Sequence, residues 1–498
     1  MAPSMEIFVF AFLLFSLSLL LRIRPHLSGK LGGADCWFYL IYVRELKRAK
    51  RFPPKFSHFI LDSEEQWYPP GFPMLLSLLP DPLLKKWHWI ISPIIDCFHE
   101  LMVFFFTLWI TGSLYVSAVA GLFYAIVPTL YTENRNLNSR ALSSLLFSLN
   151  MLCLFLYMEN PSWTLCIPVL ISGFLVLMTH KMATQVLGFT YVFLAVYLGE
   201  WCVLLLLLST IGLTFFLSGG FYVKVLRAHF DILAFWRRHL DNLRAHQVLD
   251  SPQYRDPNRK ADNFYAPGFR GARKNLIHLF AHNPLILIVP AIIRADYSFF
   301  SGWILSILAL TLLTTFFRPM LFLGEGFKYI KYLIFPQSFF LGMYVVTTQG
   351  GFWGRSSVIF LGLLSLGVML YSHIYTQRES VGKVAAMDDS LLTVLQALKE
   401  LPKESVLCLP TPLAEVVAYE TGKRVLWGAH GYGFKKLEGF FPVLEKPLEN
   451  FFREYKIDYF LLDEEFAPVS TFRFSNDILE EILSIGKYVL YGVKEKSM

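Results

Sequence analysis

The sequence predicts a polytopic α-helical membrane protein, with about eleven transmembrane helices and a small soluble α/β domain at the C-terminus. The 498 residues are 55% hydrophobic and only 17% charged, whereas a soluble domain contains about 25% charged residues. Long apolar runs reach the roughly 18 to 20 residues that a helix needs to cross the hydrocarbon core of a bilayer. This composition excludes an ordinary soluble protein.

The apolar runs begin at residues 7–21. No basic segment precedes this run and no small-residue cleavage pattern follows it, so we expect a retained helix rather than a signal peptide. Two polar loops, at about 22–88 and 221–283, separate the remaining runs. The remaining apolar runs lie near residues 89–110, 114–130, 141–158, 163–179, 184–200, 202–218, 284–293, 297–317, 330–348 and 356–374.

Near residue 380 the composition changes to that of a soluble domain. We therefore expect a transmembrane domain at 1–379 and a soluble domain at 380–498. Helical patterns alternate with short apolar strands, which favours a mainly parallel sheet. The expected helices are 391–401, 413–419 and one ending near 455, and the expected strands are 406–409, 424–427 and 458–462.

Charge and cysteine usage narrow the class of ligand. The net charge is +7, and the basic residues gather in loops beside the apolar runs, which suits anionic headgroups or a phosphate-bearing substrate better than nucleic acid. The six cysteines are scattered without ligand-like spacing. Neither a disulfide framework nor a zinc site is indicated.

If the N-terminus is cytoplasmic and successive spans cross the membrane in alternate directions, the main polar segments fall on the same side of the membrane. The 22–88 and 221–283 loops, residues 131–140, 179–181 and 324–331, and the C-terminal domain all fall on the outer side. The positive-inside rule opposes this orientation, but it is weak for loops of about 60 residues or more. We expect an integral plasma membrane protein whose site faces outside.

Asp35 is the leading candidate for catalysis. It follows the glycine pair at 32–33 and begins a stretch in which Tyr39 and Val43 share one helical face and Arg44 lies on another, as in an interfacial amphipathic helix. One interpretation is a helix N-cap. The other is a general base or a metal-ligating carboxylate, which the flexible glycines would let a substrate approach.

Glu64 and Glu65 stand shortly before the sequence Trp67-Tyr68-Pro69-Pro70. Either they are solvated loop charges, or one of them returns to Asp35 and completes a carboxylate pair. Such a pair would hold a divalent cation, Mg²⁺ or Mn²⁺, through oxygen ligands. No other cofactor is expected.

Five basic residues at the ends of apolar runs are candidates for binding an anion. As ordinary boundary residues they would contact lipid headgroups or extend toward the interface. As a site, they would bind phosphate, for which the planar guanidinium is especially suited. They are Arg140, His180, Lys181, Lys328 and Lys331.

Asp96, His99 and Glu100 occur inside an apolar run. Ionisable groups within a membrane are functional candidates, so a proton or ion pathway would use them. His430, in a glycine-rich loop of the soluble domain, is interpreted as structural.

Several motifs together resemble the GT-C superfamily of membrane glycosyltransferases. Asp35 lies in the first outer loop before Trp37-Phe38-Tyr39-Leu40 and an Arg-Glu-Leu helix, and Tyr68-Pro69-Pro70-Gly71 follows. The resemblance extends to residues 134–140 and 179–181, to the stretch 324–329, and to the soluble domain after many spans. Cys36-Trp37 stand where a second acid of a DxD-like motif would be. No WWD-type motif occurs, and the absence of that motif argues against transfer of a whole glycan to asparagine.

The resemblance implies a hexosyl- or pentosyltransferase of the cell envelope. It would transfer a sugar from a polyprenyl-phosphate-linked donor to a glycan, lipid or protein acceptor, without nucleic acid. Asp35 would act as general base in an inverting displacement, and the five basic residues would stabilise the leaving phosphate. Tyr68, Glu133 and Glu325 would support the site.

Two other functions are considered. A secondary transporter or flippase of a lipid-linked or anionic substrate would use Asp96, His99 and Glu100, although it predicts internal repeats that are not evident. A noncatalytic membrane scaffold would bind a partner through its C-terminal domain.

Overall fold

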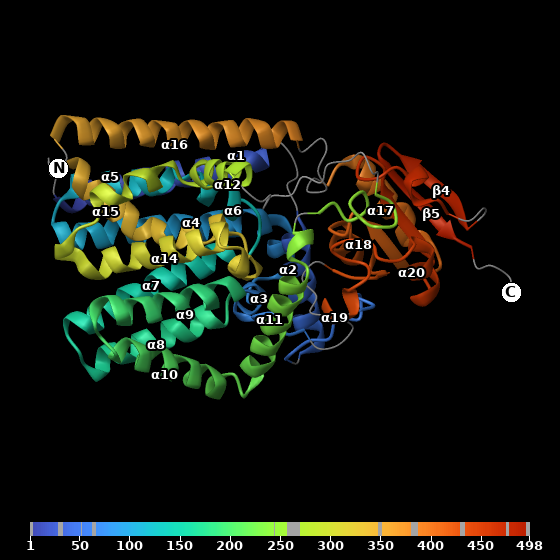
Figure 1. The fold of residues 1–498 in the computed structure, drawn as a ribbon, viewed down its shortest axis with the longest axis horizontal. Coiled ribbons are helices and arrows are strands. Elements are labelled where there is room, and N and C mark those ends of the chain that lie inside the picture. Colours follow the sequence, from blue (N-terminus) through green and yellow to red (C-terminus); the bar gives the residue numbers. More distant parts are fainter. Residues whose placement is uncertain are drawn as a thin grey trace.

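The computed structural model describes residues 3–27, 33–50, 52–61, 66–243, 245–255, 269–346, 351–379, 387–428, 434–474 and 478–494. A domain of roughly parallel helices occupies one end of the molecule, and a small α/β domain occupies the other (Figure 1). Glu64, Glu65 and His430 lie outside the described residues.

Six helices among the described residues are long and apolar enough to cross a membrane. They are α1 (Pro3–Leu27), α4 (Asp81–Thr111), α7 (Arg140–Glu159), α9 (Lys181–Leu198), α14 (Ser298–Phe316) and α16 (Gly351–Glu379). The chain is thus built as an integral membrane protein.

Three bent pairs raise the possible number of described spans to nine. They are α5 (Leu114–Ala125) with α6 (Pro128–Asn134), α10 (Cys202–Leu217) with α11 (Phe221–Arg238), and α12 (Phe269–His282) with η2 (Pro284–Ile288) and α13 (Val289–Ile292). The expected count of about eleven is not confirmed, because α8 (Trp163–Leu177) and α15 (Ile334–Val346) are short and other apolar runs bend.

Aromatic rings fill the interior of the helical domain. Trp303 of α14 is fully buried, stacks on Phe335 of α15, and donates its indole N–H to the backbone oxygen of Tyr332 at 2.8 Å. Buried indole and phenol groups need such partners. This packing fixes the irregular segment η4 (Arg318–Leu323), η5 (Gly326–Lys328) and η6 (Ile330–Leu333) against the bundle.

The C-terminal domain contains a five-stranded sheet in the order β2-β1-β3-β5-β4. The strands β1 (Ser405–Leu409), β2 (Arg424–Val425) and β3 (Tyr459–Asp463) are parallel, as expected, whereas β4 (Leu479–Ile485) and β5 (Tyr488–Val493) add an antiparallel hairpin that the sequence interpretation missed. The described helices are α17 (Asp389–Glu400), α18 (Leu413–Thr421), α19 (Phe434–Leu437) and α20 (Leu448–Glu454).

The first long loop joins the two domains. Its Ile60 donates its backbone N–H to the Val425 oxygen at 2.9 Å, and Val425 donates to the His58 oxygen at 2.7 Å, so the loop extends the edge of the sheet beside β2. The helix α2 (Ala34–Ala49) packs against α3 (Gly71–Ser77) and α18. Arg44 of α2 donates to the backbone oxygen of Tyr419 at 2.9 Å.

The expectation of an interfacial helix at α2 is therefore only half right. The helix is amphipathic, but eight of its residues are buried, because α18 of the C-terminal domain covers the face that would otherwise be exposed. Trp37 lies in this contact, with its ring centroid 5.4 Å from that of Tyr419.

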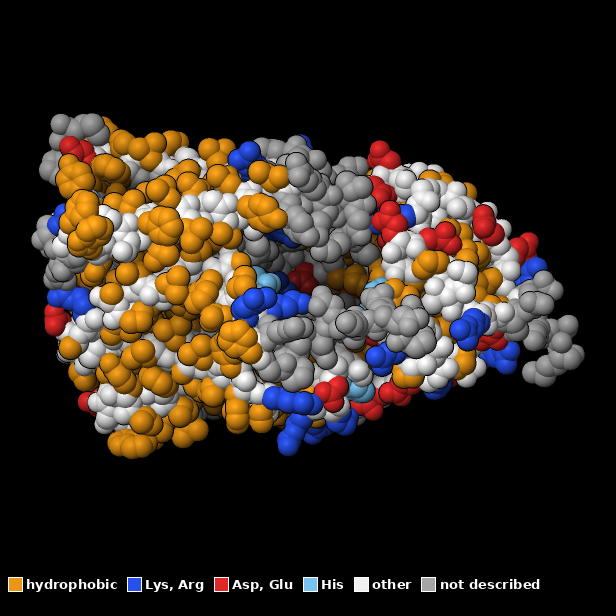
Figure 2. Space-filling view, turned by 45° about the horizontal axis from the view of Figure 1, so that its top comes forward, with side chains coloured by type: hydrophobic (Ala, Val, Ile, Leu, Met, Phe, Trp, Pro, Cys, Tyr) orange, Lys and Arg blue, Asp and Glu red, His pale blue; other side chains and the backbone are white. Residues whose placement is uncertain are grey.

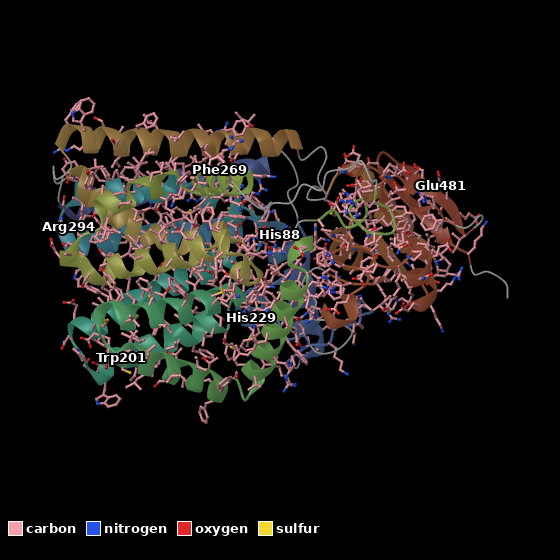
Figure 3. The ribbon with its side chains drawn as sticks, viewed as in Figure 1. His88, Trp201, His229, Phe269, Arg294 and Glu481 are labelled. Carbon is pink, nitrogen blue, oxygen red and sulfur yellow. The ribbon has the colours of Figure 1, made fainter. Side chains whose placement is uncertain are left out.

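The polar segments gather where the two domains meet. Figure 3 shows Trp201 and Arg294 at the far end of the helical domain, whereas His88 and His229 lie near the boundary. Apolar side chains cover the visible surface of the helical domain, and a hollow at the boundary contains acidic, basic and histidine side chains (Figure 2). Helix α11, bent by 115° from α10, crosses the ends of the bundle beside this boundary (Figure 1).

Candidate active site

Asp35 lies in the first turn of α2, at the boundary between the domains. The N-cap of α2 is Gly33, and no side chain makes a capping hydrogen bond there, so the interpretation of Asp35 as an N-cap is wrong. Its Oδ2 instead lies 3.0 Å from Nη2 of Arg140, and 26% of the side chain is exposed. Asp35 is thus an ion-paired carboxylate with a partly exposed side chain.

Arg140, the first residue of α7, bridges two carboxylates. Its Nη1 donates to Oε2 of Glu133 at 3.0 Å, opposite the contact with Asp35. Asn138 fixes the intervening turn by donating to the Glu133 backbone oxygen and accepting from the Arg140 backbone N–H, both at 2.8 Å. The planar guanidinium suits such paired contacts. Arg140 positions Asp35, and its contact with a phosphate stays a prediction.

Lys331 is buried beside this network, with only 1% of its surface exposed. Its Nζ has no hydrogen-bond partner within the described residues. Burial lowers the pKa of the ammonium to about 7; Arg140 and Lys328 also lower it, while Glu133 opposes them. A buried cation without a hydrogen-bond acceptor costs free energy, and an anionic ligand would relieve this cost.

The turn that precedes α9 meets the first long loop. Gly71 donates its backbone N–H to the Met178 oxygen at 2.7 Å, which brings Tyr68 beside His180 and places Nζ of Lys181 5.9 Å from the Tyr68 ring centroid. His180 caps α9 by accepting from the Met182 backbone N–H at 3.2 Å. Burial, together with Lys331, Arg140 and Lys181, lowers the pKa of His180 well below its usual value.

His180 is therefore a neutral helix cap, and it adds no positive charge to the cluster. Its predicted contact with phosphate would have to be made by an uncharged imidazole. Lys181, next along the chain, supplies the charge at this position.

Glycines shape the segment that carries Lys328. Gly324 has φ 134°, a conformation that favours glycine. A β-carbon on Gly326 would lie 2.0 Å from Oγ1 of Thr315 and 2.5 Å from the backbone oxygen of Thr311, so the segment packs directly on α14. Lys328 then pairs with Glu325, with Nζ 2.8 Å from Oε2.

A pocket of about 290 Å³ opens between α9, α11 and the segment 321–328. Its lining combines polar and charged side chains with apolar ones. The polar lining includes Lys181, Gln185, His229, Glu325 and Lys328, and the apolar lining includes Ile232, Leu233, Trp236, Leu321, Phe322 and Leu323. This combination suits an anionic headgroup attached to a hydrocarbon chain.

The described residues do not form a metal site by themselves. They contain no group of three or more His, Cys, Asp or Glu side chains placed to hold an ion, and Asp35 is paired with a guanidinium. The predicted Mg²⁺ or Mn²⁺ depends on Glu64 and Glu65, which lie outside the described residues. The metal therefore stays a prediction.

Asp96 has a structural environment. Its Oδ2 accepts from Nε of Arg22 at 2.6 Å, and its Oδ1 accepts from the Tyr124 hydroxyl and from Nδ2 of Asn134, both at 2.8 Å. His99 lies 2.9 Å from the Ser148 hydroxyl through Nε2. These buried contacts hold α1, α4, α5 and α6 together, and they give Asp96 fixed partners.

Sequence interpretation missed the contribution of α11 to the pocket. The sequence signal for this contribution was the spacing of Val225, His229, Ile232 and Trp236, which places these residues on one helical face. The spacing alone does not show what this face contacts, because the pocket is completed by residues far away in the sequence.

Comparisons with known proteins agree on the fold. No protein-family model and no curated protein sequence matches the chain. The fold is similar to that of solved structures of GT-C membrane glycosyltransferases. In particular, ArnT from Cupriavidus metallidurans in the apo state aligns with a TM-score of 0.62 and 10% identity over 97% of each chain.

The oligosaccharyltransferase from Archaeoglobus fulgidus in the apo form aligns with a TM-score of 0.57 and 12% identity, over 92% of this chain and 70% of that one. Further structures of these two proteins contain undecaprenyl phosphate, in ArnT, and an inhibitory peptide with a dolichol-phosphate, in the oligosaccharyltransferase. The resemblance expected from the sequence is confirmed at the level of the fold.

Proposed function

We propose that this protein transfers a sugar from a polyprenyl-phosphate-linked donor to an acceptor, with Asp35 as general base. The binding of undecaprenyl phosphate by ArnT and of a dolichol-phosphate by the archaeal oligosaccharyltransferase supports the donor class. The observation that carries the proposal is the ion pair between Asp35 and Arg140, in electrostatic contact with Lys181 and Lys331 and near a pocket whose lining is both charged and apolar.

The proposed reaction is a single displacement. The acceptor oxygen attacks the anomeric carbon, its proton passes to the Asp35 carboxylate, and the bond between the anomeric carbon and the phosphate oxygen breaks. The polyprenyl phosphate leaves with the bonding electrons, and the configuration inverts. A general base must lie within hydrogen-bond reach of the proton it takes, which the partly exposed position of Asp35 permits.

The leaving phosphate gains negative charge as the bond breaks. Lys181 and Lys328 line the pocket, and Lys331 is buried nearby. Fixed cations in a water-poor site stabilise such charge by several kcal/mol, and are commonly the largest contribution to catalysis. The apolar lining residues of the pocket would hold the first isoprene units.

The remaining parts of the proposal concern placement and specificity. Residues 1–379 would form the catalytic membrane domain, and residues 380–498 a soluble domain that covers α2 on the outer side of the plasma membrane. The sugar would be a hexose or a pentose, and the acceptor a glycan, lipid or protein. Tyr68, Glu133 and Glu325 would support the charged residues that they adjoin.

The transporter alternative is not favoured, because Asp96 is bonded to Arg22, Tyr124 and Asn134 inside the bundle. A carboxylate with three fixed partners has a structural role in linking the helices. A group in a proton or ion pathway must instead exchange its partners during each transport cycle.

The direct test uses purified protein in nanodiscs, a panel of radiolabelled polyprenyl-phosphate sugars, and membrane glycan and lipid extracts as acceptors. Transfer, or slow hydrolysis in the absence of acceptor, is expected for at least one donor. Passage of the labelled lipid across proteoliposome membranes, without release of sugar from any donor, would instead support a flippase.

A further inference from the structure

A second pocket adjoins a face of α2 other than the one that carries Asp35. It has a volume of about 410 Å³ and forms where α2, the start of α4 and α18 of the C-terminal domain meet. Arg44 comes about two and a half turns after Asp35 on α2, so the two side chains lie on opposite helical faces. The residues that line the pocket are Leu40, Val43, Arg44, Asp81, Pro82, Leu84, Lys85 and Tyr419.

Helix α18 fixes Arg44 in this lining. Nη1 and Nη2 of Arg44 donate to the backbone oxygens of Tyr419 and Ala418 at 2.9 and 3.4 Å, and the guanidinium carbon lies 4.9 Å from the centroid of the Tyr419 ring. The contact with Glu45 is long, at 3.8 Å between Nε and Oε1, and the Arg44 side chain is partly exposed. A guanidinium of the helical domain is thus held at the pocket by the C-terminal domain.

Lys85 adds a second positive charge to the lining. Asp81, the acidic residue of the lining, accepts a hydrogen bond from Nζ of Lys47, so its charge is already compensated. Lys85 is exposed and forms no ion pair within the part of the chain that the structure describes. Arg44 and Lys85 therefore favour an anionic ligand, and a phosphate matches the fork of the guanidinium.

The start of α4 places the pocket at the level of the lipid headgroups. The helix contains 31 residues and is about 46 Å long, which matches the roughly 40–45 Å of a bilayer with its headgroups included. Leu78, Leu83 and Trp87 are exposed around this end of α4, as residues in contact with lipid are. His88, one turn after Lys85, lies near the boundary between the domains (Figure 3).

We propose that this pocket binds a membrane phospholipid with an anionic headgroup. The headgroup phosphate would contact Arg44 and Lys85, and the acyl chains would lie along Leu83 and Trp87, which are one turn apart on α4. The two cations favour an anionic headgroup over a zwitterionic one. One lipid bound in this way would contact α2, α4 and α18 together, and so link the helical domain to the C-terminal domain. The proposal does not depend on the proposed sugar transfer.

The test is native mass spectrometry of the full-length protein in detergent, with phosphatidylglycerol and phosphatidylcholine supplied in equal amounts. The wild type should retain one phosphatidylglycerol with a preference of at least about tenfold, and Lys85→Gln should reduce this preference by about fivefold, the contribution of one lysine at a charged surface. Lys86→Gln is the matched control and should keep the preference. Lys86 is exposed in the same turn of α4, but it is not among the residues that line the pocket.

Pro82→Trp tests the pocket without a change in charge. Pro82 is exposed and lines the pocket, so an indole in its place should fill the space and reduce retention of phosphatidylglycerol. Thermal unfolding in detergent checks that each variant is folded. Pro82→Trp also provides the measurement if Lys85→Gln does not fold.

The remaining outcomes would each overturn the proposal. An equal loss in Lys85→Gln and Lys86→Gln would show a diffuse attraction of anionic lipids to the basic surface. Unchanged retention in Lys85→Gln or in Pro82→Trp would show that the lipid binds elsewhere, and equal retention of the two lipids by the wild type would exclude an anionic site. Displacement of phosphatidylglycerol by an equal concentration of glycerol 3-phosphate would identify a site for soluble phosphates instead.

Discussion

The guanidinium of Arg140 lies 3.0 Å from the carboxylate of Asp35, and the two residues come from helices that are far apart in the sequence. The same guanidinium holds Glu133 at 3.0 Å on its other side. One planar guanidinium therefore links the Asp35 carboxylate of α2 to α7 and to Glu133.

Replacement of Arg140 by Lys should lower kcat/KM by roughly 100-fold, because a single ammonium cannot hold both carboxylates in the geometry of the guanidinium fork. The measurement is sugar transfer by purified protein, with thermal unfolding to confirm the fold. Arg294→Lys is the matched control, since Arg294 lies at the opposite end of the bundle (Figure 3). Full activity in Arg140→Lys would show that the bridge is dispensable.

Donor binding should weaken as the pH rises through about 7. Burial, with Arg140 and Lys328, lowers the pKa of Lys331 to about 7 against the opposing effect of Glu133, and a lysine carries its positive charge only below its pKa. A bound anion will raise that pKa, so the midpoint in the complex should lie above 7.

The probe for this prediction is a non-hydrolysable glycosyl phosphodiester of the polyprenol, whose own charge is constant over this range of pH. Lys331→Met should bind it more weakly at about pH 6 and should lose most of the dependence on pH. A wild-type affinity that does not change between about pH 6 and pH 9 would exclude titration of Lys331.

Gly326→Ala should destabilise the protein by about 1–3 kcal/mol, the usual cost of overpacking, because the new β-carbon would collide with Thr315 and the backbone of Thr311. The displaced segment should also raise KM for the donor by moving Lys328. Gly188→Ala is the control, since a β-carbon there meets nothing within 4 Å. Equal unfolding temperatures for the two variants would contradict the close packing on α14.

Asp96→Ala should reduce stability by about 3–5 kcal/mol, because it leaves the buried Arg22 without its counter-ion. The transfer rate per folded molecule should change little. The double variant Arg22→Met with Asp96→Leu should recover much of the stability, as apolar replacements of buried ion pairs often do. Loss of transfer in an Asp96 variant of normal stability would assign Asp96 to the function instead.

The sequence predicted the features that depend on local pattern. Long apolar runs gave the main membrane helices, alternating helices and apolar strands gave β1, β3 and α18, and alternate threading brought Arg140, Lys181 and Lys328 to one end. These predictions succeed because hydrophobic periodicity and span length are properties of short segments.

The features that were missed depend on distant contacts. No local pattern shows that α18 covers α2, that Arg22 of α1 pairs with Asp96 of α4, or that Arg140 bridges Asp35 and Glu133. Short or bent apolar segments such as α13 and α15 also made the number of spans uncertain from length alone. The hairpin of β4 and β5 was missed because the outer face of β4 is largely exposed and polar.

The catalytic assignment is tested most directly by Asp35→Asn, which keeps the shape of the side chain and removes its ability to take a proton. Purified and folded Asp35→Asn should still bind undecaprenyl phosphate, while its rate of sugar transfer falls by about 10²–10⁴-fold, the usual contribution of a general base. Transfer at a rate close to that of the wild type would contradict the assignment of Asp35 as the base.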